Sequence, residues 1–250
     1  MKKASLLCVL LLALAASVAS AAAGVNLRWN ACLGDAGLLN KNFACLSNVG
    51  TNLLQGSFEL GANIDNVNGS EPVVDLASAG PTLPDWWQFK NAGVCRSASL
   101  SIGANTAASL CPDWAGLLAS ENIAAYQLGL YGPTTARILL VNAVAPDALQ
   151  NLAPGQEFSS FQLAINNAKT AGLGTCAGCL VPVCLVFNSL KLTTVGAVGD
   201  RILVGPTNGT DSNYATWQGG AGTISTKGQG CPQATPTKNA TWGSVKALYR

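Results

Sequence analysis

The sequence contains no histidine at any of its 250 positions. Without an imidazole, a chain cannot form the Ser-His-Asp or Cys-His arrangements that activate a nucleophile. The most common protein ligand for zinc and copper is missing for the same reason. Serine hydrolase, metalloprotease and most oxidoreductase functions are therefore disfavoured, and neither a metal site nor another cofactor is expected.

Charged residues are also scarce, at 10% of the chain, against about 25% in ordinary soluble domains. Fourteen basic and twelve acidic residues give a formal net charge of +2, and the basic residues form no run. A nucleic-acid interface needs a basic patch opposite the phosphates, so nucleic-acid binding is not expected. Asn, Gln, Ser, Thr and Gly must cover the surface instead, a composition that suits extracellular β-proteins.

The first 21 residues have the three parts of a secretory signal peptide. Lys2 and Lys3 are followed by an apolar run over residues 4–18 and then by the small residues Ala19, Ser20 and Ala21. The apolar run is shorter than the ~20 residues that a membrane span needs, and no second apolar stretch of that length follows. We expect cleavage after about Ala21, which removes both lysines and leaves a nearly neutral chain without a membrane span. The two-lysine start favours a bacterial signal, and the location is expected to be extracellular, at the cell surface or periplasmic.

Cysteine usage agrees with export, because eight of the nine cysteines lie beyond the signal. An even number in an oxidising compartment indicates disulfides. Proximity in sequence favours Cys32–Cys45 and Cys95–Cys111, with the last four cysteines pairing among themselves. These are Cys176, Cys179, Cys184 and Cys231. Two alternatives remain open, a zinc site formed by the last four thiolates and a redox site at Cys176-Ala-Gly-Cys179.

Apolar residues alternate with a period of two along most of the mature chain, which is typical of β-strands. The clearest example is residues 158–165, where Phe158, Phe161, Leu163 and Ile165 mark an apolar face. The other expected strands are residues 25–29, 54–60, 72–76, 86–89, 98–102, 125–130, 136–144, 184–192 and 201–204. Turn-forming residues separate them, so the sequence predicts an all-β, antiparallel β-sandwich of the jelly-roll or cohesin-like kind over residues 22–204. Short helical turns are expected only at residues 114–120 and at the C-terminus.

The composition changes after Val204. Residues 205–238 are rich in Gly, Thr, Asn and Ser, which predicts a loosely packed extension within a tail over residues 205–250. The last ten residues combine Trp242 and Leu248 with the cationic Lys246 and Arg250. This ending is expected to pack on the sandwich as an amphipathic element, and the alternative is a detachable sorting signal.

Several short motifs together resemble a family of uncharacterised secreted bacterial proteins. They are Leu83-Pro-Asp-Trp-Trp87, Cys176-Ala-Gly-Cys179 with Cys184, Thr216-Trp-Gln-Gly-Gly220 and the ending over residues 241–250. The resemblance covers nearly the whole mature chain and implies secretion, but no activity. A weaker similarity in fold to cohesin-like and carbohydrate-binding jelly rolls depends on the strand alternation alone.

Two neighbouring tryptophans suggest a binding surface. In an extended strand Trp86 and Trp87 would point to opposite faces, so one indole would enter the core and the other would be exposed. An exposed indole beside Asp85 and Gln88 would suit a sugar, with Trp114 as a second aromatic candidate. The alternative is that both tryptophans belong to the core.

Carboxylate chemistry is the catalytic option that survives without histidine. Glycosidases place two acids on either side of the scissile bond, and the candidates are Asp85, Asp113, Glu121 and Glu157. Residues 63–71 have the composition of a calcium loop, but Ile64 stands at the first ligand position, so a turn between strands is expected. The sequence therefore favours a secreted, non-catalytic module that binds a glycan or a protein, with a carboxylate-based hydrolase as the alternative; the oligomeric state is not predicted.

Overall fold

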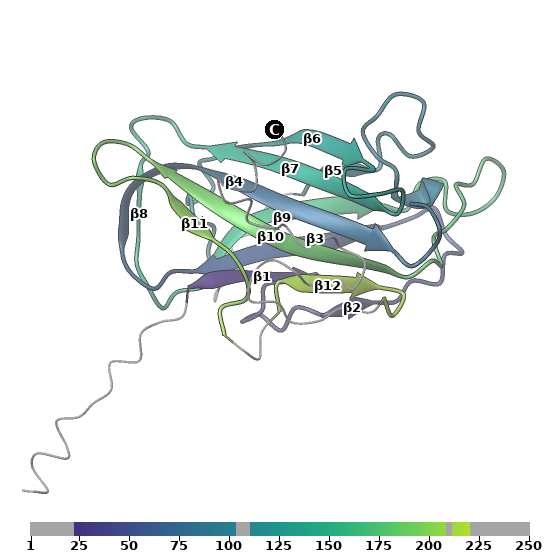
Figure 1. Ribbon diagram of the computed structural model, residues 1–250, viewed down its shortest axis with the longest axis horizontal. Helices are drawn as coiled ribbons and strands as arrows, with labels where there is room; N and C mark the ends of the chain where they lie inside the picture. The colour runs from purple at the N-terminus through teal and green to yellow at the C-terminus, as the bar shows by residue number, and fades with distance from the viewer. Residues whose placement is uncertain (1–22, 104–110, 209–211, 221–250) are drawn as a thin grey trace, which may run out of the picture.

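The computed structural model describes residues 23–103, 111–208 and 212–220, and within them the chain folds as a sandwich of two β-sheets (Figure 1). The smaller sheet has four antiparallel strands in the order β1-β3-β9-β5. Its strands are β1 (Gly24–Trp29), β3 (Thr51–Glu59), β9 (Phe158–Asn166) and β5 (Leu100–Ile102). The predicted all-β sandwich is confirmed.

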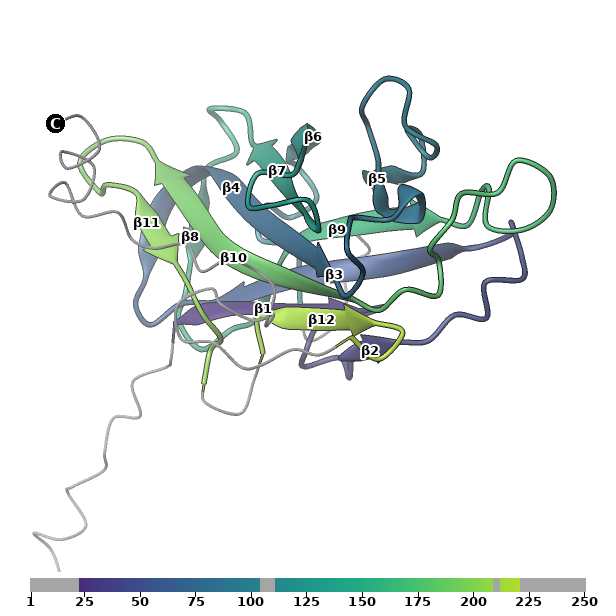
Figure 2. The ribbon, with the colours of Figure 1, turned by 45° about the vertical axis from the view of Figure 1, so that its right-hand side comes forward.

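The larger sheet has eight strands, six of them in the order β2-β12-β10-β4-β7-β6. These are β2 (Asn40–Lys41), β12 (Tyr214–Trp217), β10 (Val183–Thr194), β4 (Ile64–Ser78), β7 (Thr135–Ala143) and β6 (Ser120–Leu128). The remaining two, β11 (Arg201–Leu203) and β8 (Gln150–Leu152), pair with β10 and β4. All pairs in this sheet are antiparallel except β2 with β12. Figure 2 shows the strands of both sheets in a view turned by 45° from that of Figure 1.

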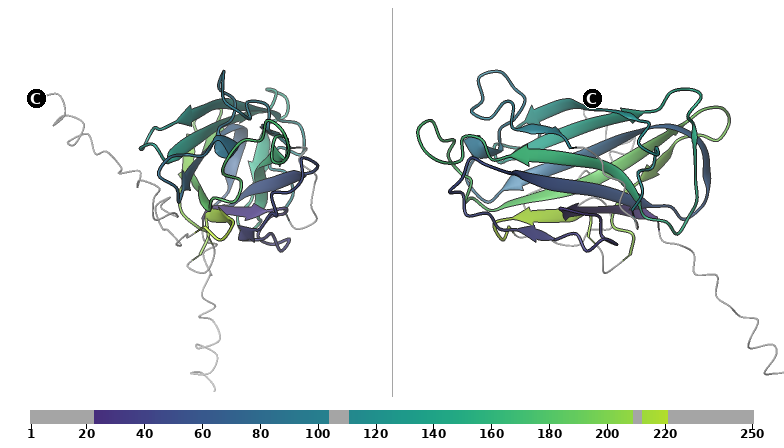
Figure 3. Two further views of the ribbon diagram at one scale, coloured as in Figure 1. Left: turned by 90° about the vertical axis from the view of Figure 1, so that its right-hand side faces the viewer. Right: turned by 180° about the vertical axis from the view of Figure 1, so that it is seen from behind.

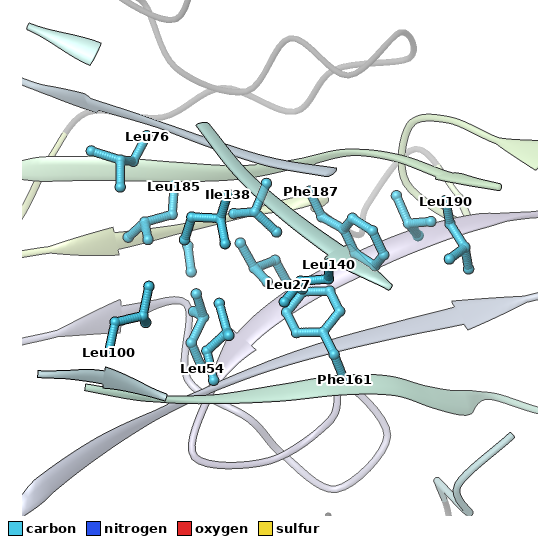
Figure 4. Packing of buried hydrophobic residues seen from close by; sticks show 14 of the residues in the cluster. Leu27, Leu54, Leu76, Leu100, Ile138, Leu140, Phe161, Leu185, Phe187 and Leu190 are labelled. Carbon is cyan, nitrogen blue, oxygen red and sulfur yellow. The ribbon is translucent and has the colours of Figure 1, made fainter. Parts of the chain in front are cut away.

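The hydrophobic core fills the space between the sheets, and its residues follow the alternation seen in the sequence. Leu27, Leu54, Leu100 and Phe161 enter it from the smaller sheet, as Figure 4 shows. Leu76, Ile138, Leu140, Leu185, Phe187 and Leu190 enter it from the larger one. Because alternate side chains of a strand point to opposite faces, a period of two was enough to predict most of these strands.

Three predictions about local structure were wrong. Asp85–Trp87 forms a 3-10 turn, η1, and not the strand expected at residues 86–89. Residues 63–71 form no turn, because β4 begins at Ile64. A bulge at Asn66, which has a positive φ of 57°, lets both Ile64 and Val67 face inward. No helix forms at residues 114–120, where β6 begins at Ser120.

The extension expected from Gly205 onward is also wrong where the structure describes it. β12 pairs with β10 and places Ala215 and Trp217 in the core. Four residues are too few to show a strand pattern in a sequence rich in Gly and Thr. The predicted signal peptide, Cys231 and the C-terminal element lie outside the described residues. Within the described part of the chain, no helix is long and apolar enough to cross a membrane.

Several loops lie together at one end of the sandwich, which we call the stapled end. It gathers residues 30–50, 79–99, 129–134, 167–182 and 218–220, which follow or precede strand ends that lie side by side. These loops lie at the right in Figure 1, and the view from behind in Figure 3 shows them at the left.

Candidate functional site

A cluster of tryptophans forms the base of the stapled end. The ring centroid of Trp217 lies 5.0 Å from that of Trp86, 5.6 Å from Trp87 and 5.7 Å from Trp29. Trp86 and Trp87 contact each other at 5.1 Å with an edge-on geometry. All four indoles are completely buried. The Leu-Pro-Asp-Trp-Trp and Thr-Trp-Gln-Gly-Gly motifs therefore meet in space, although 130 positions separate Trp87 from Trp217.

The Cys-Ala-Gly-Cys motif joins the same cluster through backbone contacts. The amide of Trp86 donates to the carbonyl oxygen of Ala177 at 2.9 Å, and the Trp217 indole Nε1 donates to that of Cys179 at 2.7 Å. Gly178 has a φ of 98°, and a Cβ there would lie 2.1 Å from the Cβ of Pro84. Only glycine fits both that conformation and that contact, so the motif requires its glycine.

Two disulfides fasten these loops across the stapled end. They are Cys45–Cys179 and Cys95–Cys176, and a third, Cys32–Cys111, links the first of these segments, residues 30–50, to a residue outside them. The predicted pairs Cys32–Cys45 and Cys95–Cys111 were wrong, as was the expectation that the last four cysteines pair among themselves. The reason is that sheet topology brings distant loops together and overrides proximity in sequence. Cys184 is also disulfide-bonded, and none of the other described cysteines is left to be its partner.

This pairing excludes both alternatives for the Cys-x-x-Cys motif. Cys176 and Cys179 are bonded to different loops, so their thiolates are not available as zinc ligands or as a redox pair. A Glu157 carboxylate oxygen lies within 4.8 Å of the Cys32 and Cys111 sulfurs. Because those sulfurs form a disulfide, this group does not offer the thiolates that a metal site needs.

Arg96 holds the same loops together from inside. Its guanidinium donates to the carbonyl oxygens of Trp86 at 2.6 Å and Ala168 at 3.0 Å, and also to that of Asn166. It stacks 3.6 Å above the centroid of the Trp86 ring. Burial lowers the pKa of Arg96 to about 9, so the side chain is still cationic at neutral pH. The sequence analysis missed this residue, because one arginine beside a cysteine has no distinguishing pattern.

Above η1 lies an open groove with a volume of about 790 Å³. Its apolar lining includes Leu83, Leu128 and Val181, and its polar lining includes Asp85 and Gln88. The Gln88 side-chain amide donates to the carbonyl oxygen of Leu83 at 2.9 Å, which orients it at the rim. The residues that line this groove come from three loops and the end of β6. No single sequence pattern therefore pointed to its apolar lining residues.

The predicted binding residues do not all lie at the groove. Asp85 and Gln88 line the groove, but Trp86 and Trp87 are both fully buried, so the expected exposed indole was wrong. The η1 turn directs both indoles inward, where an extended strand would have exposed one. Trp114 is buried in a turn before β6 and does not line the groove.

One of the four candidate acids, Glu121, is affected by another, Asp113. Burial, together with the negative charge of Asp113, raises the pKa of Glu121 to about 7. Asp113 accepts hydrogen bonds from the amides of Ala115 and Leu117, which gives it a role in the turn. Glu121 and Leu128 are at opposite ends of β6, so a strand rise of about 3.3 Å per residue puts this pair roughly 20 Å from the groove.

The other two acids are placed separately. Glu157 is buried and accepts from the amides of Leu33 and Gly34, at 3.1 and 2.7 Å, and from the Ser57 hydroxyl. These contacts fasten a loop to the smaller sheet. Asp85 is the acid at the groove.

Comparison with known proteins adds no relative, since neither a protein-family model nor a curated protein matches the chain.

Proposed function

We propose that this chain is a secreted, non-catalytic module that binds a short extended segment of a partner protein in the groove above η1. The observation that carries the proposal is the groove itself, with its apolar walls and its polar rim of Asp85 and Gln88. Concave sites of several hundred Å³ with a few oriented polar groups are typical of ligand binding.

The lining favours a polypeptide over a glycan. Among the described residues that line the groove, none is aromatic, whereas sugar-binding sites commonly stack a pyranose ring on an exposed indole or phenol ring. Leu83, Leu128 and Val181 instead offer surfaces for aliphatic side chains, and Asp85 suits an amide or a cationic side chain.

The disulfides support the extracellular part of the proposal. Three bonds link segments 79 to 134 residues apart, and such bonds persist in oxidising compartments. Two of them, Cys45–Cys179 and Cys95–Cys176, also restrain the loop that supplies Ala177 and Val181 to the groove before a ligand arrives, which lowers the entropy cost of binding. Secretion through the N-terminal signal and membership of the family with the matching motifs remain proposals with it.

The test is a random linear peptide library displayed on phage, run in parallel with a glycan array. We expect peptides to be enriched and glycans to be absent. Ala177→Trp, which fills the groove, should abolish peptide binding, whereas Ala145→Trp, on an exposed loop outside the groove lining, should leave it unchanged. If a glycan binds and Ala177→Trp blocks it, the ligand of the groove is a sugar and not a peptide. If a peptide binds and Ala177→Trp has no effect, the groove is not the binding site.

A carboxylate-based hydrolase is the second candidate, and the pair formed by Asp113 and Glu121 is what favours it. A carboxyl group with a pKa near 7 can act as a general acid at neutral pH. The test is release of reducing sugar from a panel of polysaccharides, compared between the wild type and Glu121→Gln. Activity in the wild type that this substitution removes would establish the hydrolase, and its absence from the whole panel would leave binding as the function.

A further inference from the structure

Two neighbouring loops of the stapled end, residues 42–50 and 170–182, expose apolar side chains and contain no charged residue. Leu173 is fully exposed, Leu46 and Val49 are each 82% exposed, and Leu180 is 66% exposed. Single exposed leucines are ordinary on a protein surface, but several on adjoining loops indicate an interaction site. We call these four side chains the apolar tips.

The two loops are fixed to each other, so the apolar tips are held in an exposed arrangement. Cys45 and Cys179 form a disulfide between them. The Asn48 side chain accepts from the amides of Thr170 at 2.7 Å and Ala171 at 2.9 Å, and donates to the carbonyl oxygen of Ala171. These contacts restrain the second loop at both of its ends, on either side of Leu173. The restraint also means that little further entropy is lost when the tips are buried.

The nearest charges along both loops are positive. Lys41 directly precedes the first loop and Lys169 directly precedes the second. No acidic residue occurs over residues 36–58 or 158–199, and the nearby Asp85 belongs to the groove lining. Exposed apolar side chains on loops that each follow a lysine match the interface of a membrane, where acyl chains lie below anionic headgroups.

We propose that the apolar tips insert into the interface of an anionic lipid membrane and that Lys41 and Lys169 contact its headgroups. A protein partner would be expected to meet a surface of mixed polarity, whereas residues 42–50 and 170–182 contain no charged side chain. None of the four apolar tips lines the groove, although Ala177, Gly178 and Val181 of the second loop do, so substitutions at the tips leave the groove lining itself unchanged. The membrane contact would hold a secreted module against a cell surface without a membrane-spanning segment.

The experiment is co-sedimentation of the purified protein with vesicles of phosphatidylcholine, with and without 30 mol% phosphatidylglycerol. We expect binding to the anionic vesicles that weakens as salt is raised. Val49→Ser with Leu173→Ser should reduce the partition coefficient by about 100-fold, since full burial of each side chain is worth about tenfold or more. Lys169→Gln should weaken binding to anionic vesicles by a few-fold and leave binding to neutral ones unchanged.

The matched control is Leu118→Ser with Ile202→Ser, two side chains outside the tip loops that are 62% and 67% exposed. All four positions are exposed, and thermal melting checks that both double variants fold. The proposal would be overturned if the wild-type protein bound neither kind of vesicle. It would also be overturned if the Val49→Ser, Leu173→Ser variant bound anionic vesicles as well as the control variant does. A dimer that forms on concentration and is lost in the tip variant would assign the tips to a second copy of the chain, and would equally overturn it.

Discussion

Substitution of Arg96 tests whether one buried cation holds the stapled end together. Arg96→Met keeps an apolar side chain of similar length but leaves three carbonyl oxygens without this donor, those of Trp86, Asn166 and Ala168. A buried acceptor without its donor costs ~1–3 kcal/mol, and the lost stacking on Trp86 costs about 2 kcal/mol at a desolvated site. Removal of the buried charge also eliminates its desolvation penalty, which offsets the loss by several kcal/mol. The net loss should be about 3–5 kcal/mol, a large part of the ~5–15 kcal/mol of a typical domain.

Urea denaturation followed by tryptophan fluorescence measures this loss, because the tryptophan cluster lies against Arg96. Arg96→Lys separates charge from geometry. A lysine keeps the cation, but its single ammonium cannot reach three acceptors as the planar guanidinium does, so we expect it to recover less than half of the loss. The control is Lys191→Met, which removes an exposed lysine paired with Glu71 and Asp200 and should leave the urea midpoint unchanged. An Arg96→Met protein as stable as the wild type would refute the reasoning.

Three further predictions concern the cysteines, one glycine and one acid. Peptide mapping without reduction should recover the three described disulfides and a fourth that joins Cys184 to Cys231. A bond between Cys32 and Cys45 would contradict the fold. Reduction should lower the free energy of unfolding by about 4–5 kcal/mol for each long loop released. Gly178→Ala should destabilise by about 1–3 kcal/mol in urea denaturation, because its Cβ would overlap Pro84 at a positive φ. Gly172→Ala, which also has a positive φ but open space around it, should cost less. The folded protein binds more protons at Glu121 than the unfolded chain between about pH 4.5 and pH 7, so the stability from this group is present at low pH and lost as the pH rises. Glu121→Gln should therefore gain about 1–2 kcal/mol relative to the wild type between pH 4.5 and pH 8, allowing for solvent screening of a half-buried group; equal pH profiles would contradict the raised pKa.

Strands with a regular pattern were predictable, and those without one were not. Residues 158–165 and 184–192 became β9 and β10 nearly as expected, because inward residues alternate on either side of one bulge in each range. β12 was missed because it has only four residues, and the start of β4 was missed because its two paired inward residues, Ile64 and Val67, are three positions apart. The jelly-roll or cohesin-like assignment remains a prediction.

For the candidate site, the motifs marked the right segments but not their arrangement. Leu-Pro-Asp-Trp-Trp, Cys-Ala-Gly-Cys and Thr-Trp-Gln-Gly-Gly were each noticed, and Asp85 and Gln88 were chosen from the first. Their contact through Trp86, Ala177 and Trp217 depends on strand order, which local sequence does not encode. The burial of both adjacent tryptophans likewise follows from η1, which packs them onto an indole from β12.

The sequence by itself determined the class of the fold and the chemistry that is excluded. Alternation with a period of two makes the protein all-β, and the lack of histidine removes imidazole catalysis, since both properties are local to the chain. Only the tertiary structure decided the disulfide pairs, the tryptophan cluster, the groove and the apolar tips. Each of these is formed by loops that are distant in sequence and become neighbours only when the order of strands in the two sheets brings their ends together.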